Sequence, residues 1–336
     1  MTSAVIFGCA GPQLDAAEAA FFREMQPLGF ILFGRNVVDP AQLRRLTSDL
    51  RAAIDRPDAP ILIDQEGGRV RRLRPPHWRQ IPAPGIFGAL AARDLAAAER
   101  AVALNHRLMA AELRDVGITV DCAPLLDIRF PGAHDVVGDR SFGSDPALIT
   151  KLGRIAATAL LEGGVMPVIK HIPGHGRAMV DSHLDLPRVT EKHAALAASD
   201  FQPFVALKDL PWGMTAHLVY EAIDPDHPAT LSRKVIGDVI RGEIGFDGLL
   251  LTDDLSMKAL KGSFTERAAG SLAAGCDVVL HCNGDMAEMR QVAAGLSPLS
   301  AAAKARYERG QARLRAVAGS AIDPAETRAE LERLVG

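Results

Sequence analysis

The residues best suited to chemistry lie in one segment, KHIPGHGRAMVDSH, at positions 170–183. It holds three of the ten histidines of the chain. Asp181 and His183 flank one serine, so both side chains can face the same way on an extended or turning segment. A carboxylate beside an imidazole fixes the tautomer and favours the protonated ring, which would make His183 a general acid near neutral pH. A capping aspartate beside a surface histidine has the same spacing, so both interpretations remain open.

The same segment could instead bind a metal ion through His171 and His175, joined by Asp181 and His183. A His-x-x-x-His pair presents both rings on one face only in a helix. Pro173 and two glycines in the segment disfavour a helix there. Neither Cys nor Glu completes a usual zinc ligand set. We therefore favour acid–base chemistry over a metal site.

A second segment, GLLLTDDLSM, places two carboxylates after a run of leucines at positions 248–257. Carboxylates at the end of a buried strand cost free energy unless they have partners. We expect Asp254 to cap the next helix. Asp253, nearer the centre of the sheet, is then available as a nucleophile or charge stabiliser.

A third segment, ILIDQEGGRVRRLR, contains Asp64 and four of the five arginines that lie from Arg69 to Arg79. The pair Gly67–Gly68 permits a sharp turn, so Asp64 and one or two arginines can reach the same site. Such an arginine-rich segment is usually a solvated surface loop. The alternative is carbohydrate recognition, in which aspartate accepts hydrogen bonds from sugar hydroxyls and arginine donates to hydroxyls or a carboxylate.

Eight short apolar runs predict the strands that position these residues. They are rich in Val, Ile, Leu and Phe without clean alternation, which is typical of parallel strands buried on both faces. The expected strands are residues 4–9, 29–33, 61–64, 118–122, 166–171, 213–217, 249–253 and 278–281. The expected helices are residues 40–54, 91–115, 146–161, 191–207, 232–243, 286–296, 300–317 and 324–334.

The alternation of strands and helices predicts βαβ units and a parallel sheet. Eight units favour one α/β domain over residues 1–336, a (β/α)₈ barrel of the TIM type with additional C-terminal helices on its outside. An open doubly wound sheet has similar local signals. However, residues 8–11 match the Gly-x-Gly-x-x-Gly phosphate turn of such sheets poorly. No linker or break in composition indicates a second domain.

Six of the eight expected strands end in polar residues. In barrel enzymes this end of the strands holds the active site, because the loops that follow converge there. The residues are Asp64, Asp121, Lys170, His171, His217, Asp253, Asp254 and His281. Any one of them alone could simply cap a helix or be a polar residue at the rim of the barrel. Together they favour a site at the mouth of the barrel.

Composition limits the classes of function. The chain of 336 residues is 48% hydrophobic and carries a net charge of −3, so it is neither disordered nor a dedicated nucleic-acid binder. No apolar run is long enough for a membrane span, and no basic residue precedes Arg23 as a secretion signal would require. Four cysteines without C-x-x-C spacing indicate a reducing compartment. We expect a cytoplasmic monomer.

Taken together, these segments resemble glycoside hydrolase family 3, in particular its single-domain bacterial β-N-acetylglucosaminidases of cell-wall recycling. The similarity runs from about Gly29 to Asn283 and is most specific in KHIPGHG with its trailing DSH and in TDDLSM. It implies a retaining exo-enzyme without metal or organic cofactor. The typical substrate of such enzymes is N-acetylglucosamine β-1,4-linked to 1,6-anhydro-N-acetylmuramic acid, with or without a stem peptide.

The resemblance also implies roles for individual residues. Asp253 corresponds to the nucleophile, and His183 to the general acid/base with Asp181 as its partner. Most retaining glycosidases use two carboxylates, so a histidine acid is a departure from the common pattern. The positions that match those holding N-acetylglucosamine are Asp64, Arg72, Arg140, Lys170 and His171.

Two features depart from the wider family. Ile172 stands where Phe is commoner, which we interpret as a packing change. We expect no second domain of the kind that many β-glucosidase relatives carry, where it often supplies a carboxylate acid, and this expectation favours the aminosugar branch. The alternatives are a β-N-acetylglucosaminide phosphorylase, a metal-dependent hydrolase and a non-catalytic sugar-binding barrel, in that order.

Overall fold

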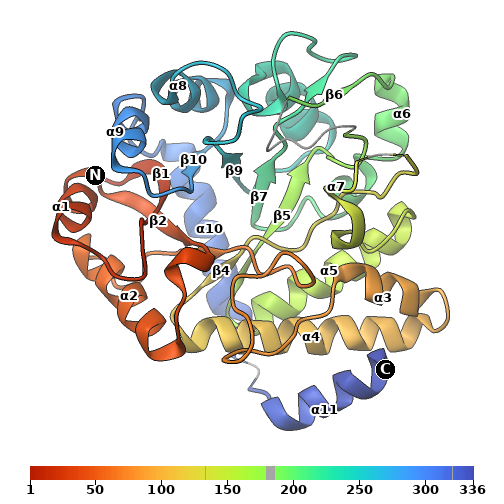
Figure 1. Ribbon diagram of the computed structural model, residues 1–336. Helices are drawn as coiled ribbons and strands as arrows, with labels where there is room; N and C mark the ends of the chain where they lie inside the picture. Colours follow the sequence, from red (N-terminus) through yellow and green to blue (C-terminus); the bar gives the residue numbers. More distant parts are fainter. Residues whose placement is uncertain (133, 179–185, 320) are drawn as a thin grey trace.

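A closed barrel of parallel strands forms the centre of the molecule (Figure 1). The computed structural model describes residues 1–132, 134–178, 186–319 and 321–336. The strands follow the order β1-β10-β9-β7-β5-β4-β3-β2 around the barrel. They are β1 Ser3–Gly8, β2 Pro27–Leu32, β3 Ile61–Ile63, β4 Val120–Asp121, β5 Met166–Ile172, β7 Trp212–Thr215, β9 Leu249–Asp254 and β10 Val278–His281.

All eight predicted strands therefore occur in the barrel, and the predicted (β/α)₈ class is confirmed. The main differences lie at strand ends. β4 pairs over two residues rather than five, and β7 ends at Thr215, so His217 lies just beyond it. A separate two-stranded parallel sheet, β6 Arg188–Val189 with β8 Val219–Tyr220, was not predicted, because two residues are too few for a sequence pattern.

Helices surround the barrel. The α-helices are α1 Ala16–Met25, α2 Pro40–Ala53, α3 Pro84–Ala91, α4 Leu95–Asp115, α5 Pro146–Glu162, α6 His193–Ala198, α7 Gln202–Ala206, α8 Phe264–Ala274, α9 Met286–Ala294, α10 Ala301–Val317 and α11 Pro324–Val335. Short 3₁₀ turns are η1 Gly34–Asn36, η2 Gly138–Arg140 and η3 Ala229–Leu231, and η4 Val235–Glu243 is a π-helix. The α-helices α1 and α8 and most of α3 lie outside the ranges we predicted.

Local sequence explains where several helices begin. α2, α5 and α11 each start with an Asp-Pro pair, in which the aspartate side chain accepts a backbone N–H of the first turn. Proline fits that first turn because its missing N–H would have no helical partner there. By contrast, the helix predicted for residues 191–207 is divided into α6 and α7. Pro203 has no N–H to continue a helix from Ser199, so the chain turns between them.

Side chains of the strands alternate between the barrel interior and the helices outside. Phe7 of β1 packs on Phe21 and Phe22 of α1, with ring centroids 5.5 and 6.3 Å away. Phe22 also packs edge-on against Phe30 of β2 at 5.0 Å. The adjacent Ile6 is equally buried but belongs to the other cluster of core residues, toward the barrel interior. Burial on both faces accounts for the continuous apolar runs in the sequence.

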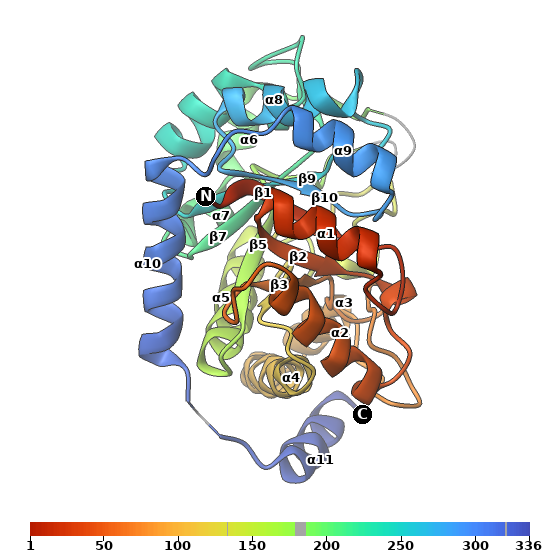
Figure 2. The ribbon, with the colours of Figure 1, turned by 90° about the vertical axis from the view of Figure 1, so that its left-hand side faces the viewer.

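The C-terminal helices lie outside the barrel, as predicted. α10 runs along one side of it, and α11 lies against α4 (Figure 2). Arg100 of α4 pairs with Glu330 of α11 through two hydrogen bonds of 2.7 and 2.9 Å. No helix in the described residues is long and apolar enough to cross a membrane.

We predict that Phe22→Ala lowers the free energy of unfolding by about 3–5 kcal/mol, because it removes a fully buried ring from between α1 and two strands. Urea unfolding followed by circular dichroism measures the change. The exposed Val38→Ala should stay within about 0.5 kcal/mol of the parent protein. A loss below about 1 kcal/mol for Phe22→Ala would show that this aromatic cluster does not hold α1 on the barrel.

Candidate active site

A cavity of about 230 Å³ opens at the carboxyl ends of the barrel strands. It brings together six of the eight residues that the sequence predicted for the site. These are Asp64, Arg72, Arg140, Lys170, His171 and Asp253. The other two, Asp181 and His183, lie outside the described residues. The structure thus brings these six side chains together around one cavity. That this cavity is the active site, and the role of each residue, stay predictions.

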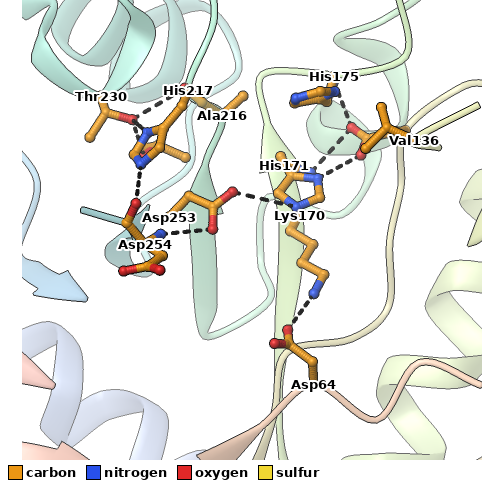
Figure 3. A network of polar contacts seen from close by, with 12 residues as sticks. Asp64, Val136, Lys170, His171, His175, Ala216, His217, Thr230, Asp253 and Asp254 are labelled. Carbon is orange, nitrogen blue, oxygen red and sulfur yellow. Dashed lines mark hydrogen bonds and ion pairs between the residues drawn. The ribbon is translucent and has the colours of Figure 1, made fainter. Parts of the chain in front are cut away.

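Lys170 anchors one side of this cavity. It lies two residues before the end of β5, with a side chain only 2% exposed. Its ammonium lies 2.8 Å from Asp64 and 2.6 Å from Glu66 (Figure 3 shows the contact with Asp64). Burial alone would lower the pKa of Lys170, but the two carboxylates outweigh it and hold the pKa above its usual range. The Arg72 guanidinium lies 3.1 Å from Asp64.

Glu66 was not predicted, although it joins two predicted residues. Its carboxylate accepts two hydrogen bonds from Arg140, of 2.7 and 2.8 Å, besides the contact with Lys170. Burial would raise the pKa of Glu66, but the charges of Arg140 and Lys170 outweigh burial and lower it to about 2. In the sequence, the only signal was its place two residues after Asp64, just before a Gly-Gly turn.

Asp253 is the last residue but one of β9, and its side chain is 18% exposed. Its Oδ1 accepts the backbone N–H of Asp254 at 2.8 Å, and its Oδ2 lies 3.8 Å from Nε2 of His171 (Figure 3). The first contact fixes the rotation of the carboxylate about its side-chain bonds. The second oxygen thus faces the imidazole across the cavity.

The expectation that Asp254 caps the next helix is wrong. α8 begins only at Phe264, where Ser263 caps it. The Asp254 carboxylate instead accepts the backbone N–H groups of Ser256 at 3.0 Å and Cys282 at 3.1 Å. It closes a turn and connects β9 with the end of β10, because the chain between β9 and α8 is a loop rather than a direct strand-to-helix junction.

His171 is oriented by Asp127, a buried residue that sequence reasoning missed. Nδ1 of His171 lies 2.7 Å from Asp127 Oδ2, and Asp127 Oδ1 accepts the backbone N–H groups of His171 and His175 at 3.2 and 2.7 Å. Burial would raise the pKa of Asp127, but His171 and His175 lower it. Because Nδ1 faces this carboxylate, Nε2 is the ring atom turned toward Asp253. The available signal was an aspartate after the apolar run APLL.

The His175 ring packs against the His171 ring, with centroids 5.4 Å apart. Burial lowers its pKa to about 4, helped by the neighbouring His171, so its ring is neutral at pH 7. Among the residues that the structure describes, no three His, Cys, Asp or Glu side chains are grouped as a metal site would require. Two members of the metal set considered above, Asp181 and His183, fall outside those residues.

Not every polar strand end reaches the cavity. Asp121 is fully buried and accepts the backbone N–H of Gln65 at 3.0 Å, so it supports the loop that carries Glu66. His281 is also fully buried, 3.6 Å from Glu288. These two positions are structural, and a pattern of polar strand ends does not separate them from site residues.

Comparison with known proteins agrees with this geometry. Residues 10–317 match the glycosyl hydrolase family 3 N terminal domain. The chain belongs to glycoside hydrolase family 3. A β-hexosaminidase of Alkalilimnicola ehrlichii is 43% identical over 286 residues, covering 83% of this chain and 80% of that protein. One from Methylococcus capsulatus is 40% identical over 282 residues, covering 83% and 82%.

Solved structures extend the similarity to the whole chain. NagZ from Neisseria gonorrhoeae, in complex with N-trifluoroacetyl-D-glucosamine, has 31% sequence identity and a TM-score of 0.88, and covers 100% of this chain and 98% of that one. The family 3 assignment therefore rests on both sequence and fold. The predicted enzyme class, a glycoside hydrolase of the β-N-acetylhexosaminidase type, is confirmed.

We predict that Glu66→Gln lowers the free energy of unfolding by about 3 kcal/mol at pH 7, because it leaves Lys170 and Arg140 buried with one fewer carboxylate. The pKa of Glu66 is lower in the folded state than in the unfolded chain, so its contribution is complete above about pH 4.5 and disappears toward pH 2. The difference from the parent protein should therefore be constant from pH 7 to about pH 4.5 and shrink as the pH falls further toward 3.

Urea unfolding at several pH values measures this difference. Glu332→Gln is a matched control, since it removes an exposed pair with Arg328 and should change stability by less than about 0.5 kcal/mol. A Glu66→Gln difference that stays constant from pH 7 to pH 3 would contradict the ionised pairing.

Proposed function

We propose that this family 3 enzyme is a retaining exo-β-N-acetylglucosaminidase of peptidoglycan recycling. It would remove terminal β-1,4-linked N-acetylglucosamine from muropeptides that contain 1,6-anhydro-N-acetylmuramic acid. The observation that carries the proposal is the Asp253 carboxylate in a cavity whose walls hold the residues matching the family's sugar-binding positions. The similar NagZ structure with N-trifluoroacetyl-D-glucosamine supports an N-acylated aminosugar as occupant.

In the proposed mechanism Asp253 Oδ2 attacks the anomeric carbon, while the leaving oxygen takes a proton from His183. The bond between sugar and leaving group breaks as a glycosyl ester of Asp253 forms. His183 then removes a proton from water, which attacks the same carbon and releases N-acetylglucosamine with its configuration retained. Asp181 would hold the His183 ring. No metal or organic cofactor takes part in these steps.

Recognition of the sugar is assigned to the charged walls of the cavity. Asp64 can accept hydroxyl hydrogens, and Arg72, Arg140 and Lys170 can donate to hydroxyl or acetamido oxygens. Arg72 and Lys170 pair with Asp64, and Arg140 pairs with Glu66, so these groups would be held in place before the sugar arrives. His171 faces the same space and would donate or accept through Nε2.

Hydrolysis is favoured over phosphorolysis by the charges of this cavity. Among its described lining residues, each lysine and arginine is already within 3.1 Å of a carboxylate. A phosphate ion would have to compete with Asp64 and Glu66 for these cations. Phosphate-dependent release of sugar 1-phosphate would reverse this conclusion.

The wider setting is also a proposal. All four cysteines, Cys9, Cys122, Cys276 and Cys282, are buried and unpaired, which fits a reducing compartment such as the cytoplasm. We propose a monomer that acts there on small muropeptide or chito-oligosaccharide substrates.

Asp253→Ala should abolish turnover, by at least about 10⁴-fold, because the covalent step loses its nucleophile. A 5-fluorinated N-acetylglucosaminyl fluoride should label the parent enzyme at Asp253, as read by mass spectrometry of its peptides. Label on another residue, or a product of inverted configuration by NMR, would exclude this mechanism.

His183→Ala should slow substrates with poor leaving groups, such as a disaccharide, far more than activated aryl glycosides. The reason is that only poor leaving groups need a proton in the first step. Kinetics on a series of aryl N-acetylglucosaminides measure how steeply the rate depends on the leaving group. The matching β-glucosides and added phosphate serve as controls. Equal slowing across the series would argue against an acid role.

A further inference from the structure

His217 is buried beside Asp253 but lines no part of the sugar cavity. It follows β7 and is fully shielded from water. Its Nε2 lies 3.0 Å from the backbone carbonyl oxygen of Asp254, and its Nδ1 lies 2.7 Å from the Thr230 hydroxyl (Figure 3). None of the roles discussed above uses this ring.

The contacts of His217 determine its tautomer. A carbonyl oxygen only accepts, so Nε2 must carry the hydrogen that binds Asp254. Burial lowers the pKa of His217 below its usual value, so the ring is neutral at pH 7 and Nδ1 has no hydrogen. The Thr230 hydroxyl must therefore donate to Nδ1 at 2.7 Å, and the Ala216 carbonyl, at 3.2 Å from the same hydroxyl, is the more distant acceptor. Its oxygen lies 2.8 Å from the Thr215 hydroxyl, which is then the donor to Thr230.

The backbone of Asp254 connects His217 with Asp253. Its carbonyl, in the peptide bond to Leu255, is held by His217, while its N–H, in the peptide bond to Asp253, donates to Oδ1 of Asp253 at 2.8 Å. Oδ1 is thereby held away from the cavity, and Oδ2 is the oxygen that faces His171. The orientation of the Asp253 carboxylate thus depends on a chain of hydrogen bonds that starts in β7 and η3 and ends in β9.

We propose that His217 is a positioning residue for the nucleophile: the Thr215–Thr230 hydroxyl pair holds it as the Nε2–H tautomer, and it fixes the backbone of Asp254, whose N–H orients the Asp253 carboxylate. The inference rests on the proposed role of Asp253. It predicts an effect on the attack step, common to all substrates, with little effect on how tightly the sugar binds.

The tautomer is tested first, without reference to activity. Long-range ¹H–¹⁵N NMR of histidine-labelled protein at pH 7.5 distinguishes the two ring nitrogens, and His217→Gln assigns the signal by its disappearance. We expect an Nε2–H tautomer with an unprotonated Nδ1 in the parent protein. An Nδ1–H tautomer or a charged ring would overturn the proposal, whatever residue the fluorinated sugar labels.

The kinetic test removes the hydroxyl that sets the tautomer. Thr230→Val should lower kcat/KM about tenfold for activated and poor leaving groups alike, the effect of one lost hydrogen bond on the attack step. The inhibition constant of N-acetylglucosamine should change less than about twofold, and Thr230→Ser, which keeps the hydroxyl, should restore most of the rate.

Thr47→Val controls for the loss of a buried hydroxyl, since Thr47 of α2 bonds the Val116 carbonyl at 2.9 Å, away from the site. It should leave kcat/KM unchanged. If Asp253 is labelled but Thr230→Val has the parent rate, or Thr230→Ser is as slow as Thr230→Val, the positioning role is wrong. If the label falls on another residue while the NMR result holds, the proposed function fails and the tautomer assignment stands.

Discussion

The mouth of this barrel depends on one almost completely buried lysine. An ammonium group shielded from water is costly unless carboxylates surround it, and Lys170 has two, Asp64 and Glu66, within 2.8 Å. Those carboxylates in turn hold Arg72 and Arg140. The result is a connected set of paired charges that lines the cavity.

Charge balance connects this set with Asp253. Three cations, Lys170, Arg72 and Arg140, face two carboxylates, so the cluster has one positive charge in excess. The Asp253 carboxylate in the same cavity completes the balance. If Asp253 is the nucleophile, as proposed, its bond with the sugar would neutralise this carboxylate and leave the cluster with one positive charge in excess.

Two histidine rings flank Asp253, and a different kind of partner orients each of them. Asp127 is a carboxylate, so the His171 ring directs Nε2 into the cavity with Nδ1 held by a charged acceptor. Thr230 is a hydroxyl, and it leaves the buried His217 neutral, with its Nε2 hydrogen on a backbone carbonyl. The same residue type therefore lines the cavity in one place and supports the backbone in the other.

The sequence by itself determined the eight strands, the helices that begin at Asp-Pro, and six residues of the cavity. Apolar runs, caps and motif spacing are properties of neighbours along the chain. Only the tertiary structure decided which groups are partners: Arg140 with Glu66, His171 with Asp127 and His217 with Asp254 are 74, 44 and 37 positions apart. The Asp254 prediction failed for the same reason, since the carboxylate binds a neighbouring strand end rather than a helix that follows. Such contacts form only when the barrel closes and brings distant strand ends to one rim.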